Sequence, residues 1–142
     1  MSEYEVVRAL KAARDAKMAG RLSEALASYR FVADSALSTD DEATRAHALR
    51  HVSDLARELG DPASAFEAAE EAVRIYRSNG GTPLDLANAL RVAALACEEG
   101  RPGQAARIWR EARFLYLESG TPAGVEECDT RIAALDRPPP AG

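Results

Sequence analysis

The feature that most constrains the fold of this chain is an internal repeat of forty residues. Gly20, Gly60 and Gly100 are spaced by forty, and an alanine follows each glycine five residues later. The alanines are Ala25, Ala65 and Ala105. Periods of roughly 20–50 residues are typical of arrays in which each repeat buries its apolar face against its neighbours. The chain is therefore expected to fold as a row of similar units.

Each unit is predicted to be a pair of helices. Upstream of Gly60, for example, apolar residues recur at Leu49, Val52, Ala56 and Leu59. This spacing matches one face of an α-helix, so it predicts a helix that ends near the glycine. Alanine is common in the chain, while β-branched and aromatic residues are sparse, and this composition favours helix over strand. We read each unit as helix, tight turn, helix.

The turn residues set the expected boundaries. The three repeated glycines are expected to end helices in the left-handed conformation that glycine adopts most easily. Pro62 and Pro102 follow two residues later and suit the first position of the next helix. The predicted helices span 3–19, 23–38, 42–59, 62–78, 83–99, 102–118 and 122–136. The tail RPPPAG at 137–142 cannot continue a helix and is expected to be disordered.

A chain of 142 residues fits one domain. Residues 1–136 are predicted to form it, with units at about 3–38, 42–78 and 83–118 and a final capping helix at 122–136. In that last helix, Asp129 and Asp136 replace Ala89 and Ala96 of the preceding unit. The end of a repeat array must face water, so these aspartates indicate a cap with a polar outer face.

The repeated positions resemble the tetratricopeptide repeat over about residues 3–136. The shared features are the turn glycine, the alanine five residues later, an aromatic residue at Tyr29 and Trp109, and a small residue in the first helix. The small residues are Ala13, Ser53 and Ala93. The unit is longer than the usual one of about thirty-four residues, and armadillo and HEAT repeats of near forty are the alternative. The resemblance implies an all-α, right-handed solenoid that binds another protein in its concave groove.

The groove-lining positions implied by this resemblance carry a basic column. In the glycine register, the groove-lining position of each first helix holds Lys11, His51, Arg91 or Arg131, and Arg14, His47 and Arg50 lie close by. Such a column would attract carboxylates or phosphates of a partner peptide, which arginine can bind through two parallel hydrogen bonds. The alternative is that these cations are only solvated helix positions.

Two other functions stay open at this point. The chain could self-associate as a homo-oligomer through Leu37, Tyr76, Leu115 and Tyr116, near the ends of second helices. His47 and His51 stand four residues apart on one helical face, the geometry of a metal-binding pair, with Asp54 as the nearest third ligand. A metal-binding or enzymatic protein centred on this pair is the alternative to solvent-facing histidines.

The remaining signals argue for a non-catalytic protein without a cofactor. The sequence contains no nucleophile elbow, no phosphate-binding glycine loop and no zinc-ligand spacing. Its net charge of −5 disfavours nucleic acid as a partner. With no secretory signal and no long apolar stretch, the chain is expected to be cytoplasmic and not to insert into a membrane. Cys97 and Cys128 are expected to be buried, reduced thiols.

Overall fold

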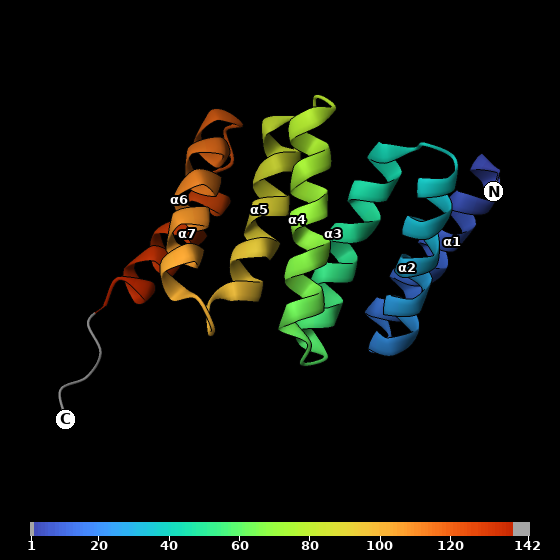
Figure 1. Cartoon of the computed structure of the whole chain (residues 1–142), viewed down its shortest axis with the longest axis horizontal. Helices are drawn as coiled ribbons and strands as arrows, with labels where there is room; N and C mark the ends of the chain where they lie inside the picture. Colours follow the sequence, from blue (N-terminus) through green and yellow to red (C-terminus); the bar gives the residue numbers. More distant parts are fainter. Residues whose placement is uncertain (1, 138–142) are drawn as a thin grey trace.

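The computed structural model describes residues 2–137, which form seven α-helices arranged in a row (Figure 1). The helices are α1 (Glu3–Met18), α2 (Leu22–Ser38), α3 (Glu42–Glu58), α4 (Pro62–Ser78), α5 (Pro83–Cys97), α6 (Pro102–Glu118) and α7 (Pro122–Leu135). Each helix packs against the next one along the chain, and α3 also packs against α5. Helices α1 and α7 lie toward opposite ends of the row. The all-α array of helix-turn-helix units is confirmed.

The turns repeat every twenty residues, which is half of the sequence period. Gly20 and Gly60 have the expected left-handed backbone, with φ of +79° and +85°. The turns between units use the same conformation, at Asp40, Gly80 and Gly120. In all five turns, the amide of the residue after the left-handed one donates to a carbonyl five residues earlier, for example Asp61 N–H to Ala56 O at 2.9 Å. This hydrogen bond satisfies a carbonyl that the helix end would leave free.

The left-handed conformation predicted for Gly100 is wrong. Its φ lies outside the left-handed region, and α5 ends at Cys97, two residues earlier than expected. Glu98 keeps helical dihedral angles (φ −57°, ψ −44°), and the Arg101 amide donates to the Cys97 carbonyl at 2.8 Å. The chain reverses gradually over residues 98–100, so no single residue in this turn needs a positive φ.

The two kinds of turn predict opposite outcomes for the same substitution. Gly60→Ala should lower the free energy of unfolding by about 1–2 kcal/mol, because a Cβ atom is strained in the left-handed conformation. Gly100→Ala should lose nothing, because its backbone suits any residue and a Cβ there would meet no neighbour within 4 Å. Urea unfolding of the two variants measures the difference. Equal losses would contradict the assignment of two turn types.

Small side chains let the helices of each pair lie close together. Ala13, Ser53 and Ala93 are all buried, and the Ser53 hydroxyl donates to the Ala65 carbonyl of α4 at 2.7 Å. The alanines that follow each turn glycine by five residues are buried as well. Tyr29 and Trp109 fill the core as large residues among these small ones. The predicted packing positions are therefore confirmed as core positions.

Both cysteines are buried free thiols, as predicted. Burial and the neighbouring carboxylates of Glu127 and Asp129 raise the pKa of Cys128 to about 11. Its thiol is therefore protonated at neutral pH and acts as a small apolar side chain.

Helix α7 is the last described helix, and its two aspartates, Asp129 and Asp136, are exposed while they also form ion pairs. Asp129 pairs with Arg113 at 2.5 Å, and Asp136 pairs with Arg110 at 2.6 Å, so both hold α7 to α6. Ala133 is exposed, although the equivalent Ala93 is buried, because no described helix follows α7 to cover it. Most of the RPPPAG tail lies outside the described residues.

Candidate functional site

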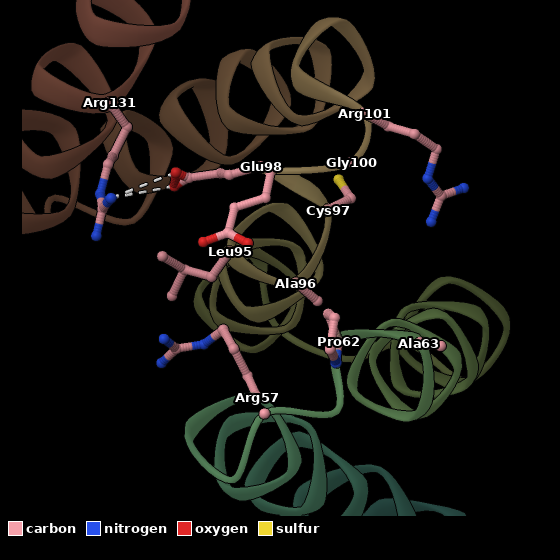
Figure 2. Close-up of a pocket in the computed structure, with 12 residues that line it drawn as sticks. Arg57, Pro62, Ala63, Leu95, Ala96, Cys97, Glu98, Gly100, Arg101 and Arg131 are labelled. Carbon is pink, nitrogen blue, oxygen red and sulfur yellow. Dashed lines mark hydrogen bonds and ion pairs between the residues drawn. The ribbon is translucent and has the colours of Figure 1, made fainter.

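The first helices of the units, α1, α3, α5 and α7, form a surface that we call the inner face. It contains two hollows. The smaller, about 200 Å³, lies between α1, α3 and α5. The larger, about 860 Å³, is bounded by α3, α5, α7 and the turns that lead into α4 and α6 (Figure 2). The hollows bring together side chains that are far apart in the sequence.

Two members of the predicted basic column tie neighbouring first helices together. Arg91 of α5 binds Glu127 of α7 through two hydrogen bonds of 2.5 and 3.1 Å. In the reverse direction, Arg131 of α7 pairs at 3.2 Å with Glu98, which directly follows α5, as Figure 2 shows. Only 16% of the Glu98 side chain is exposed, so this carboxylate is mostly shielded from water. These pairs neutralise much of the charge that the column was expected to offer a ligand.

On α1, the column begins with an exposed ion pair between Lys11 and Asp15 at 3.1 Å. The ion pair that links α1 to α3 on the inner face is formed instead by Lys17, whose ammonium lies 3.3 Å from the Asp54 carboxylate. Arg57 holds the second oxygen of the Asp54 carboxylate at 2.7 Å. The pKa of Asp54 is lowered by the Arg57 and Lys17 interactions, which outweigh the effect of its partial burial.

The two histidines are half-buried, so the interpretation that they face solvent is wrong. The His51 ring stacks on Tyr29, with centroids 4.6 Å apart and planes 12° from parallel. The His47 ring meets His51 edge-on at 4.8 Å. Burial, followed by the neighbouring His47 imidazole and the positive charges of Lys17 and Arg50, lowers the pKa of His51 to about 4. His51 is therefore neutral at pH 7.

The ion pairs of Asp54 affect whether this residue can act as the third ligand of the predicted metal site. Its two carboxylate oxygens already accept from Lys17 and Arg57, so it is not free to join His47 and His51 as a third ligand. Within residues 2–137, no group of three histidine, cysteine or acidic side chains could hold a metal ion.

Arg14 and Arg50 are the members of the predicted site that keep their charge available. No carboxylate of the described chain lies within ion-pair distance of either guanidinium. Arg14 is exposed, and Arg50 is half-buried in the smaller hollow. In the same hollow, the Asn88 oxygen accepts the Tyr116 hydroxyl at 2.8 Å, which leaves the Asn88 amide hydrogens free to donate.

The lining of the two hollows is positively charged overall, within a chain whose net charge is −5. Six cationic side chains line them against three carboxylates. The cations are Lys17, Arg50, Arg57, Arg91, Arg101 and Arg131, and the carboxylates are Asp54, Glu98 and Glu99. Such a surface can receive an anionic group through charge-assisted hydrogen bonds.

The sequence did not predict four residues that line this site: Lys17, Arg57, Asn88 and Arg101. Lys17 and Arg57 are spaced by forty, so they occupy equivalent repeat positions, but these positions differ from those of the predicted basic column. Asn88 had no such signal, because Arg8 and Ala48 occupy the equivalent positions of the earlier units.

The residues predicted to support self-association are mostly covered. Leu37 is exposed, Tyr76 and Leu115 are half-buried, and Tyr116 is buried in the core. Gly124 approaches Tyr116 so closely that a Cβ atom on it would lie 2.4 Å from the ring. Tyr116 is therefore a packing residue and not part of an exposed patch.

The fold and the inner face together define an all-α helical-repeat protein with a cationic inner surface. No protein-family model matches the chain, and the comparison with curated proteins gives no match either. In the part of the chain that the structure describes, no helix is long and apolar enough to cross a membrane.

Proposed function

We propose that the chain is a tetratricopeptide-like, non-catalytic scaffold that binds an acidic segment of a partner protein on its inner face. The observation that carries the proposal is the half-buried guanidinium of Arg50, which lines a hollow without a carboxylate partner. A half-buried cation without a counter-charge interacts more strongly with an incoming anion than an exposed one, because water screens it less.

This proposal shifts the centre of binding within the predicted basic column. An acidic ligand at Arg91 or Arg131 would have to compete with Glu127 or Glu98, which are already in place. A ligand at Arg50 and the nearby Arg14 displaces no protein carboxylate. We therefore expect the partner's acidic side chains to lie over α1 and α3, with the α5–α7 pairs serving to hold the helices.

The test is charge reversal at the two unpaired arginines. The double variant Arg14→Glu/Arg50→Glu should weaken binding of a fluorescent hexaglutamate peptide at least tenfold, because two attractive charges become repulsive. Fluorescence anisotropy at low salt measures the affinity, which should also fall for the unchanged protein as salt is added.

The matched control is Arg30→Glu/Arg107→Glu, which changes the net charge equally on exposed positions of α2 and α6. This control should bind the peptide with at most a small loss. If both double variants lose the same affinity, binding depends on net charge alone and the proposed inner-face site is wrong.

A further inference from the structure

The last hairpin of the array is incomplete within the described residues. Helices α1, α3 and α5 each pack against the next helix of their own hairpin, which is α2, α4 or α6, whereas the described residues contain no helix after α7. A groove of about 430 Å³ lies between α6 and α7, and Leu117, Pro122 and Val125 form its apolar part. Its position in the repeat indicates what this groove would accept.

The α7 side of the groove corresponds to a surface that a second helix covers in an earlier unit. Val125 of α7 lies at the same repeat position as Arg45 of α3, whose guanidinium pairs with Glu71 of α4 at 2.8 Å. Glu126 takes the place of Ala46, which is buried in a cluster with Ala72 and Ile75 of α4. In α7, both positions border the groove and have no helix over them.

The α6 side is apolar where the preceding unit is charged. Leu117 takes the place of Arg77, which pairs with Glu111 on the next second helix at 2.8 Å. Leu117 is 54% exposed, and Phe114, which takes the place of Arg74, is 60% exposed. Two arginines are thus replaced by apolar side chains at the end of the array, where exposure to water would favour charge. In the preceding unit, Arg77 of α4 meets Glu111 of α6. A helix that packs beside Leu117 would therefore need an apolar residue at its position equivalent to Glu111.

The rim of the groove is acidic. Glu126 has no ion-pair partner among the described residues, and Asp129 has only Arg113. A helix that covers them must therefore bring positive charge beside its apolar stripe. We propose that an amphipathic helix of a partner protein, with basic residues along its edge, packs into the α6–α7 groove and completes the fourth hairpin. This contact is separate from the proposed inner-face site.

A peptide of this chain provides the probe. It has the sequence of α6, Pro102–Glu118, with Glu111→Leu, so it combines the packing residues of a second helix with three arginines. The labelled peptide should bind the full chain. Leu117→Glu in the protein should weaken that binding at least tenfold, because a carboxylate would then face the apolar stripe. A peptide that keeps Glu111 should bind more weakly than the Glu111→Leu peptide.

The matched control is Leu37→Glu, at the same repeat position of α2 and 60% exposed. It should leave peptide binding unchanged, and so should Arg50→Glu, which separates this groove from the inner face. Circular dichroism checks that each variant stays helical. The proposal is overturned by no binding at several hundred micromolar peptide, or by equal losses in Leu37→Glu and Leu117→Glu. Light scattering that shows a dimer abolished by Leu117→Glu would instead assign the groove to a second copy of the chain.

Discussion

Trp109→Ala should destabilise the array by about 3–5 kcal/mol, the range for deleting a fully buried tryptophan. The Trp109 side chain has no exposed surface and belongs to a core cluster to which all five helices from α3 to α7 contribute. Alanine residues dominate that cluster, and their short side chains cannot move in to fill the space that an indole leaves. Denaturant unfolding followed by far-UV circular dichroism measures the loss.

Trp109→Phe provides the matched control. The indole nitrogen of Trp109 is buried and has no hydrogen-bond partner. Phenylalanine removes this unsatisfied donor while it keeps much of the ring, so the loss should be clearly smaller than for alanine. If phenylalanine cost as much as alanine, the indole nitrogen would have to make an interaction that the structure does not show.

The helices could be predicted from the sequence because two local signals agree. Apolar spacing of an α-helix precedes each repeated glycine, and a proline follows Gly60 and Gly100 at the start of the next helix, so local preference and tertiary packing favour the same boundaries there. At Cys97 the agreement fails. Gly100 suggested a longer helix, but the chain leaves the helix earlier and Glu98 pairs with Arg131, thirty-three residues away. A long-range contact of this kind has no local sequence signal.

The basic column shows the limit of repeat-based reasoning for a functional site. The sequence correctly placed Arg91 and Arg131 on successive first helices, because a forty-residue spacing maps onto equivalent positions. It could not show that each of them would meet a carboxylate from the other helix. Those partners, Glu127 and Glu98, occupy unrelated repeat positions, so only packing brings them together. The unpaired state of Arg50 was hidden for the same reason.

Lowering the pH from about 6.5 to 4 should reduce the free energy of unfolding by up to about 3 kcal/mol through His51 alone. In the unfolded chain its imidazole has the ordinary pKa of 6.5, whereas in the folded protein burial lowers the pKa to about 4. Between these values the unfolded state binds a proton that the folded state does not. Each pH unit of that difference is worth about 1.4 kcal/mol. The pKa of His47 is also lowered by burial, so it adds to the loss.

The pH window separates this effect from the acid sensitivity of the ion pairs. Interactions with Arg74 and Arg45 lower the pKa of Glu71 from 4.5 to about 2, so its stabilising effect is lost only as the pH falls from 4.5 towards 2. His51→Gln removes the titrating group but keeps a polar side chain beside Tyr29 and His47. Its unfolding free energy should be flatter between pH 6.5 and 4 and should fall as before at lower pH. An unchanged slope in the upper window would show that His51 is already protonated in the fold. In that case, burial and the neighbouring positive charges would not keep its imidazole neutral.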